Sequence, residues 1–226
     1  MWRLVPAFPL SPCPCPFAFT LLSLLVPCHI NPYFVAGFKL INTIGQKRRG
    51  MVVQGKKVKY RIRLAEVDDL PALPTIEQAA GQQFVELGLA YLENITLPME
   101  ILIETQQDGH VWVITTMSGE IVGFAVVSVD KEHLHLEEID IEPAHRRQGL
   151  GQKLIMAICN WAETRGIKTM SLSTFRDIPW NAPYYERLGF RIVPESELTE
   201  YLIGVREAEA RVGLPVSQRV IMRKHL

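Results

Sequence analysis

The fold is decided by residues 133–152, which read HLHLEEIDIEPAHRRQGLGQ. The first half alternates as a strand does, but its apolar residues change phase: Leu134 and Leu136 stand at even positions, whereas Ile139 and Ile141 stand at odd ones. A regular strand would send these two pairs to opposite faces, and one extra residue at the two glutamates between them restores a common face. The pattern therefore predicts a β-bulge, with a strand buried on both faces and two solvated glutamates as the alternative interpretation.

The second half of this stretch is a glycine-containing turn that opens a helix. Apolar residues recur at helical spacing from Leu150 to Trp161, and Gly166 follows as a C-cap. Unpaired backbone N–H groups at the positive end of a helix bind anions, and Gly149 and Gly151 let a phosphate approach the backbone closely. The turn is therefore a predicted phosphate site.

Two common phosphate motifs do not fit this turn. The chain contains no G-x-x-x-x-G-K-[ST] string, which excludes a Walker loop. A dinucleotide fingerprint needs a third glycine where this chain has Leu154, and an acidic residue that residues 168–174 do not supply. The anion therefore belongs to another phosphorylated ligand.

Strand and helix signals continue along the chain without repeats or low-complexity linkers. The patterns predict a half-exposed strand at residues 58–64, mainly helical structure at residues 71–104, and a hairpin formed by residues 111–116 and 120–129. Cys159 is the only cysteine after the first 50 residues and stands inside an apolar helix pattern. We therefore expect a packing thiol in a reduced, cytoplasmic compartment.

The composition is that of a globular protein with a hidden charge asymmetry. With 226 residues, of which 48% are hydrophobic and 21% charged, the chain is not mainly disordered, collagenous or coiled coil. The 24 Lys and Arg residues balance 24 Asp and Glu residues, which leaves no overall field that would attract nucleic acid or an anionic membrane. The first acidic residue, however, is Glu66, so the chain before it is basic and the chain after it is acidic.

Residues 1–50 form a predicted N-terminal extension that is rich in proline and cysteine. Its apolar run, residues 17–26, would span about 15 Å as a helix against about 30 Å for a bilayer core, so we expect no stable membrane span. Three interpretations stay open: a disordered extension, a signal or transit segment, and an artefact of start-site assignment with Met51 as the functional start.

Residues 139–143, followed by Arg146-x-x-Gly149-x-Gly151, resemble motif A of the GNAT acetyltransferase superfamily, whose pattern is Gln/Arg-x-x-Gly-x-Gly/Ala. The resemblance covers residues 58–226, which we interpret as one acetyltransferase domain, and leaves the first 50 residues unexplained. Three further segments contribute to it: residues 168–174 resemble the family's fifth strand, residues 181–190 its short helix ending in Leu-Gly-Phe, and residues 216–224 its last strand.

The resemblance implies an α+β fold in three layers: a mixed, mostly antiparallel sheet of six or seven strands with helices on both faces. The bulged fourth strand is expected to splay from the fifth. Acetyl-CoA is the implied cosubstrate, with no metal, and its pantetheine arm is expected on the backbone of Ile139, Asp140 and Ile141. Its pyrophosphate is expected on the motif A loop, here Arg146, Arg147, Gln148, Gly149, Leu150, Gly151 and Gln152.

The resemblance also implies that an amine attacks the thioester directly. An ammonium group must lose a proton before it attacks, and the departing thiolate must gain one. Glu138, at the phase break, is expected to accept the first proton, with Glu137 as the other candidate. Tyr185, four residues before Gly189, is expected to donate the second. The adjacent Tyr184 diverges by about 100° on a helix, so only one of the two tyrosines is expected to face the cofactor.

Two positions depart from the family pattern. Some members carry an acid on the fifth strand where this chain has Ser173, and the asparagine about seven residues before the tyrosine is absent at Ile178. Asn181 is assigned to the cofactor site instead, with capping of the short helix as its alternative role. These differences count against close kinship with the ribosomal-protein N-terminal acetyltransferases.

We therefore expect an acetyl-CoA-dependent N-acetyltransferase that acts on a primary amine of a small molecule or peptide, as a monomer or homodimer. A non-catalytic acyl-CoA-binding sensor is the alternative from another class, and a nucleotide-binding domain is a third. His133-x-His135 has no further metal ligands beside it, which argues against a zinc site. A cationic acceptor is indicated by the acids in residues 71–104, although a solvated helix face explains them equally well. These acids are Glu77, Glu86, Glu93, Glu100 and Glu104.

Overall fold

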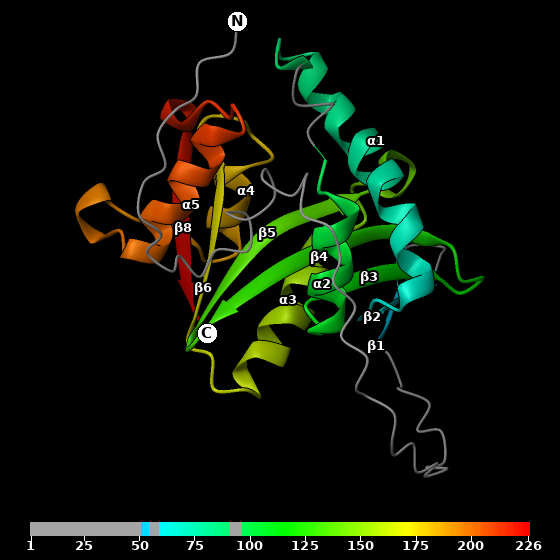
Figure 1. Cartoon of the computed structure of the whole chain (residues 1–226). Coiled ribbons are helices and arrows are strands. Elements are labelled where there is room, and N and C mark those ends of the chain that lie inside the picture. Colours follow the sequence, from blue (N-terminus) through cyan, green and yellow to red (C-terminus); the bar gives the residue numbers. More distant parts are fainter. Residues whose placement is uncertain (1–50, 55–58, 91–95) are drawn as a thin grey trace, which may run out of the picture.

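The computed structural model describes residues 51–54, 59–90 and 96–226, so the predicted N-terminal extension lies outside the described residues (Figure 1). Within the described residues the strands form one sheet in the order β1-β2-β3-β4-β5-β6-β8-β7. All neighbouring strands run antiparallel except β5 and β6, which are parallel. The strands are β1 (Met51–Gln54), β2 (Lys59–Leu64), β3 (Val111–Thr116), β4 (Ile121–Asp130), β5 (His133–Ile141), β6 (Thr169–Phe175), β7 (Arg191–Ile192) and β8 (Arg219–His225).

This topology confirms the predicted mixed, mostly antiparallel sheet and the hairpin of β3 and β4. The described part of the sheet has eight strands rather than six or seven, because the four-residue β1 and the two-residue β7 also pair with it. Segments this short carry too few alternating residues to be recognised as strands from their pattern.

Helices cover both faces of the sheet, as predicted (Figure 1). Strand β4 shows how the faces divide: Phe124 and Val126 pack toward α1 and α2, whereas Ala125 and Val127 pack toward α3. Because successive side chains of a strand point to opposite faces, each face receives its own apolar set. The five helices of the described residues are α1 (Leu73–Val85), α2 (Met99–Gln107), α3 (Leu150–Glu163), α4 (Ala182–Arg187) and α5 (Glu200–Arg211).

Helix α5 lies between β7 and β8 in the chain and has no counterpart in the sequence predictions. Its Leu202 and Val205 pack against Ile221 of β8, while the flanking residues of β8, Val220 and Met222, pack on the side of α3. Helix α5 therefore shares a face of the sheet with α1 and α2, and α3 and α4 occupy the other. Its mixed polar and apolar composition gives only a weak helical stripe, which is why the sequence pattern missed it.

Helix α3 confirms the amphipathic pattern from which it was predicted. Leu150, Leu154 and Ile158 are buried at four-residue spacing, and Gly166 follows the helix with a φ of 75°, a left-handed conformation that favours glycine. Cys159 is a free, buried thiol whose Sγ lies 3.7 Å from the Sδ of Met170, as a packing residue would.

Strand β5 contains the predicted bulge. Leu136 pairs with Val127 of β4, but the next residue of β4, Val126, pairs with Glu138, so Glu137 is the extra residue. The parallel ladder between β5 and β6 ends at the same point, with Leu136 opposite Leu172, although both strands continue. The bulge and the splay therefore coincide, and among the described residues no strand pairs with residues 137–141 of β5 on the side of β6.

None of the helices in the described residues combines the length and the apolar character needed to cross a bilayer.

We expect Gly123→Ala to destabilise the protein by about 1–3 kcal/mol, because a side chain at this position overpacks the sheet beside the bulge. A Cβ at Gly123, which pairs with Ile141, would lie 2.5 Å from the Cδ1 of Ile141 and 2.8 Å from the carbonyl oxygen of Asp140. Urea unfolding measures the loss. Adding Ile141→Val removes only the first of the two contacts, so it should restore part of the stability. Unchanged stability of the single variant would contradict the crowding.

Candidate functional site

The N-terminus of α3 presents backbone N–H groups that have no partner in the described structure. Gly149 is the N-cap residue, with a φ of 72°, and no side chain caps the helix. The first backbone bond is donated by the N–H of Lys153 to the carbonyl of Gly149 at 3.1 Å, which leaves the N–H groups of residues 150–152 without an intrahelical acceptor. A Cβ at Gly149 would meet nothing within 4 Å, so the space above the turn is open. This arrangement can bind an anion.

Tyr184 explains why the second glycine of the turn is needed. A Cβ at Gly151 would lie 3.3 Å from the hydroxyl oxygen of Tyr184, closer than most side-chain contacts allow. The Tyr184 hydroxyl therefore lies beside the N-terminal turn of α3.

Arg146 makes two contacts that its sequence motif did not predict. Its Nε donates to the carbonyl of Ile141 at 3.3 Å, and its Nη2 donates to the carbonyl of Ala80 in α1 at 3.0 Å. The guanidinium thus ties the end of β5 to α1. Its contact with a phosphate stays a prediction.

The bulge brings two consecutive glutamates to the same face of the sheet. Glu137 accepts a hydrogen bond at 2.5 Å from Ser128 of β4, whose hydroxyl oxygen also lies 2.7 Å from that of Tyr201 in α5. Glu138 pairs with Val126 on the face covered by α1, and its Oε1 accepts the N–H of Ile139 at 3.1 Å. Burial raises the pKa of Glu137 to about 7 and also raises the pKa of Glu138.

Asp140 and Glu77 complete a group of carboxyls with Glu138. Asp140 is two residues from Glu138 on the same face, and the two side chains are hydrogen bonded. Glu77 reaches the group from α1 and is 7% exposed; both of its carboxylate oxygens lie 3.1 Å from the N–H of Leu97. Burial and the charge of Glu138 raise the pKa of Glu77 to about 8, and burial with both neighbouring charges raises that of Asp140 well above its usual range. The group therefore holds protons at neutral pH.

The sequence patterns placed Glu77 in a helical region but gave no sign that it meets β5. The other acids predicted beside it lie elsewhere: Glu86, Glu100 and Glu104 are exposed, and Glu93 is outside the described residues.

Tyr185 of α4 is within reach of the charges of this group of carboxyls. Burial raises the pKa of its phenol, and the charges of Glu138 and Asp140 raise it further, so the hydroxyl keeps its proton at neutral pH. Its ring contacts Tyr184 and Phe190, with centroids at 5.3 and 5.8 Å. The rings of Tyr184 and Tyr185 meet edge-on. The Tyr184 hydroxyl lies beside the turn of α3, whereas Tyr185 is subject to the charges of β5. Which of the two faces the cofactor stays a prediction.

Arg219 is a neighbour of the site that the sequence patterns did not identify. Its Nη2 lies 2.7 Å from Oε1 of Glu209 in α5 and 3.2 Å from the carbonyl of Ser173, and both charged side chains are largely buried. Its positive charge lowers the pKa of both Glu138 and Tyr185, although burial outweighs this effect. Motifs could not reveal this pair, because one partner belongs to the unpredicted α5.

Asn181 and the two histidines have roles that the structure describes only in part. Asn181 occupies the N-cap position of α4, but its side chain makes no capping bond, so the alternative role as a cap is not seen. The Nδ1 atom of His133 bonds Thr169, and Ser171 bonds both His133 Nε2 (2.8 Å) and His135 Nδ1 (2.6 Å). Burial lowers the pKa of both histidines, that of His135 to about 3, so these rings are neutral members of a buried network.

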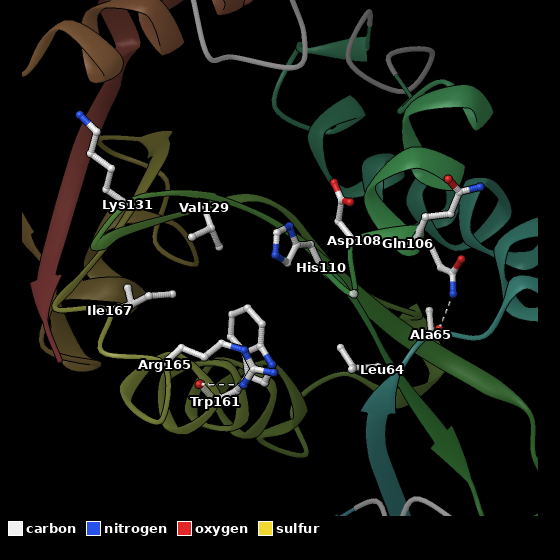
Figure 2. Close-up of a pocket in the computed structure, with 12 residues that line it drawn as sticks. Leu64, Ala65, Gln106, Asp108, His110, Val129, Lys131, Trp161, Arg165 and Ile167 are labelled. Carbon is white, nitrogen blue, oxygen red and sulfur yellow. Dashed lines mark hydrogen bonds between the residues drawn. The ribbon is translucent and has the colours of Figure 1, made fainter. Parts of the chain in front are cut away.

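A cavity of about 580 Å³ lies at the opposite end of α3 from the glycine turn (Figure 2). Trp161 of α3 and Arg165, just beyond the helix, line it, with the guanidinium 4.2 Å from the indole centroid. His110, which precedes β3, and Lys131, in the turn between β4 and β5, also line it. None of the predicted site residues lines this cavity, so it is separate from the site described above.

Residues 76–190 match the Acetyltransferase (GNAT) family. Among curated proteins, the chain is 31% identical over 81 residues to a glucosamine 6-phosphate N-acetyltransferase of Trypanosoma brucei brucei, which covers 33% of this chain and 53% of that protein. It is 29% identical over 125 residues to the [ribosomal protein bS18]-alanine N-acetyltransferase of Escherichia coli (strain K12), which covers 55% of this chain and 76% of that protein. The chain thus spans about half the length of the first relative and three quarters of the second.

Two solved structures show the same fold. The ribosomal-protein-S18-alanine N-acetyltransferase from Escherichia coli superimposes with a TM-score of 0.51 at 22% identity, covering 74% of this chain and 93% of that one. The PaiA N-acetyltransferase from Thermoplasma acidophilum, solved in complex with coenzyme A, gives a TM-score of 0.52 at 14% identity and covers 74% and 99%.

We expect Glu137→Gln to make stability less dependent on pH. The pKa of Glu137 rises from an ordinary 4.5 to about 7 on folding, so the folded state holds this proton more tightly than the unfolded state. Its contribution to the free energy of unfolding is full below the unfolded pKa and is lost as the pH rises to about 7. Glutamine keeps the hydrogen-bonding partners but does not titrate.

Urea unfolding of both proteins between about pH 5 and pH 8 tests this linkage. The other carboxyls with raised pKa values titrate in both proteins, so their effect cancels in the difference. Only the wild type loses the contribution of Glu137, so the stability of the variant relative to the wild type should increase with pH. Parallel stability curves would contradict a raised pKa at Glu137.

Proposed function

The chain belongs to the acetyltransferase (GNAT) family, and on that premise we propose that it transfers the acetyl group of acetyl-CoA to a primary amine of a small molecule or peptide. One observation carries the proposal. The unpartnered N–H groups at the start of α3 and the carboxyls at the bulge lie at the two ends of the unpaired part of β5. A ligand with a phosphate at one end and a reactive group at the other suits this arrangement.

The backbone of the unpaired part of β5 supports the assignment of acetyl-CoA. No described strand pairs with its edge on the side of β6. Two side chains bond groups of this part of β5: Glu138 accepts the N–H of Ile139, and Arg146 donates to the carbonyl of Ile141. An extended chain with amide groups, such as a pantetheine arm, is complementary to this edge. We assign the arm to Ile139, Asp140 and Ile141, and the pyrophosphate to the turn of residues 147–152. Acetyl-CoA would supply an acetyl group already activated as a thioester.

We assign the role of general base to Glu138 and propose that Asp140 stays protonated. Burial raises the pKa of both hydrogen-bonded carboxyls, so the pair holds a proton. Glu138, whose Oε1 accepts the N–H of Ile139 on the unpaired edge, is assigned as the ionised partner. Because burial raises the pKa of Glu138, its carboxylate is a stronger base than an exposed one and accepts a proton from the acceptor's ammonium group. The freed amine then has a lone pair for attack.

Tyr185 is assigned as the proton donor to the departing sulfur. Its raised pKa keeps the phenol protonated until a thiolate develops, and the influence of the Glu138 and Asp140 charges on it supports its assignment to the reaction end of the site.

A cationic acceptor suits the charge of this face. Glu77, Glu137, Glu138 and Asp140 contribute carboxyls, which Arg219 offsets only in part because it is already paired with Glu209. An ammonium group that enters would favour their ionised forms. One curated relative is named for glucosamine 6-phosphate and the other for an alanine of a ribosomal protein. Both names describe an amine acceptor, but the two acceptors differ greatly in size.

We expect Glu138→Gln to lower kcat by about 100- to 10,000-fold while CoA binding is retained, because the variant keeps a hydrogen-bonding side chain but cannot accept a proton. The matched control is Glu137→Gln, which should keep most of the activity.

Tyr185→Phe should lower kcat, whereas Tyr184→Phe, its control, should mainly raise the KM for acetyl-CoA.

A thiol-release assay over a panel of polyamines, aminoglycosides, amino acids and peptides, with CoA calorimetry, gives these values. A greater loss in Glu137→Gln than in Glu138→Gln would transfer the role of base to Glu137. CoA binding without release on any acceptor would favour a non-catalytic sensor, and absence of CoA binding would reject both functions.

We expect Glu77→Gln to raise the KM for cationic acceptors by about 3- to 10-fold, with a smaller effect on acceptors whose only charge is the reacting amine. The control is Glu86→Gln, an exposed acid at the end of the same helix. Steady-state kinetics on a matched diamine and monoamine measure the difference. Equal changes for both acceptors would show that Glu77 does not recognise a second charge.

A further inference from the structure

Tyr60 of β2 has a buried hydroxyl with an unusual pair of partners. The residue is 0% exposed, and its hydroxyl oxygen lies 2.9 Å from Nδ1 of His145 and 3.1 Å from Oε1 of Gln148. Its ring also meets the imidazole edge-on, with centroids 5.8 Å apart. Both partners belong to the segment between β5 and α3, more than 80 residues away in the chain. Strand β2, which β3 and β4 separate from β5 in the sheet, thus contacts the loop that precedes α3.

The two hydrogen bonds can exist at the same time. A phenol has one proton, and the side-chain oxygen of Gln148 can only accept, so the Tyr60 hydroxyl donates to Gln148. The second bond is then donated by the imidazole of His145, which carries its proton on Nδ1, to the phenol oxygen. Every atom in the pair of bonds is satisfied. A phenylalanine would fill the same apolar space but would remove both hydrogen bonds.

The two anchored residues bracket a strained one. Arg147 lies between them in sequence and has a φ of 60°, a left-handed conformation that side chains other than glycine rarely adopt. The next residue after Gln148 is Gly149, with a φ of 72°. Consecutive left-handed and right-handed residues turn successive N–H groups to one side, which forms an anion-binding concavity. Such a conformation persists only where the surroundings hold it, and the Tyr60 hydroxyl holds it from both ends.

We propose that Tyr60 is a positioning residue for the phosphate end of acetyl-CoA, and this inference rests on the proposed function. Tyr60 acts through Gln148 and His145: it fixes the turn so that the N–H groups of residues 147–152 already point at the phosphate before it binds. Preorganisation of this kind improves affinity because the loop loses less freedom on binding. The group that reacts is at the other end of the site, so the chemical step does not depend on Tyr60.

The test is Tyr60→Phe, measured with two acetyl donors. With acetyl-CoA, we expect the KM, and the Kd of CoA by calorimetry, to rise about 3- to 10-fold, while kcat and the KM for the acceptor are unchanged. With S-acetylpantetheine, which has the thioester and the pantetheine arm but no pyrophosphate, we expect kcat/KM to be the same as in the wild type. A residue with only a structural role would affect both donors equally.

The matched control is Thr116→Val, which removes a hydroxyl from the residue that pairs with Tyr60 in the sheet. The Thr116 hydroxyl lies 2.8 Å from that of Ser118 and bonds no residue of the loop, so this variant should leave the KM for acetyl-CoA unchanged. The proposal would be overturned if Tyr60→Phe lowered kcat/KM equally with both donors, or changed it with neither. If the wild type binds CoA but acetylates no acceptor, the proposed function fails while the CoA calorimetry still decides the role of Tyr60. A wild type that binds no CoA would overturn both.

Discussion

One extra residue in β5 is the constraint on which the site depends. Leu136 and Glu138 pair with consecutive residues of β4, so Glu137 between them has no pairing residue in that strand. The ladder between β5 and β6 ends at the same place. A bulge disrupts pairing and bends the strand, so the second half of β5 leaves β6 and keeps a free backbone edge. The same extra residue cancels one alternation, which is why Glu137 and Glu138 face the same side. A regular strand would have given neither the free edge nor the paired acids.

Burial makes these acids useful and also costly. A cluster of carboxyls cannot all ionise in a low-dielectric environment, and the raised pKa values of Glu77, Glu137 and Asp140 express that conflict. The buried pair of Arg219 and Glu209 carries no net charge: Arg219 lowers the pKa of Glu138, whereas Glu209 raises that of Glu137. The pair also attaches α5 to β8. A protein without this site would be more stable with apolar residues here, so the arrangement is typical of function rather than of stability. Through Glu209 and Arg219, helix α5 thus affects the charge around the proposed base Glu138.

The phosphate end of the site follows a different physical logic. Its positive potential comes from backbone N–H groups at the start of α3, and these need a particular loop geometry more than they need cationic side chains. The guanidinium of Arg146 is already committed to the carbonyls of Ile141 and Ala80, so it stabilises the junction between β5, α1 and the loop. Arg147, with its left-handed backbone, stands between His145 and Gln148, which both bond Tyr60 of β2. Under the proposed function, affinity at this end depends on rigidity, whereas reactivity at the other end depends on burial.

The sequence by itself determined the features whose signals are local. A change of phase within nine residues located the bulge, glycine spacing located the turn that opens α3, and helical periodicity with Gly166 located the helix itself, because period and backbone conformation are properties of neighbouring residues. Only the tertiary structure decided which distant groups meet: Glu77 with Glu138, Tyr60 with Gln148, and Glu209 with Arg219. It also decided that α5 covers the acidic face and that the pKa values shift. Charge interactions and burial depend on distances that close only when the strands pair and the helices pack, and no local pattern of residues encodes them.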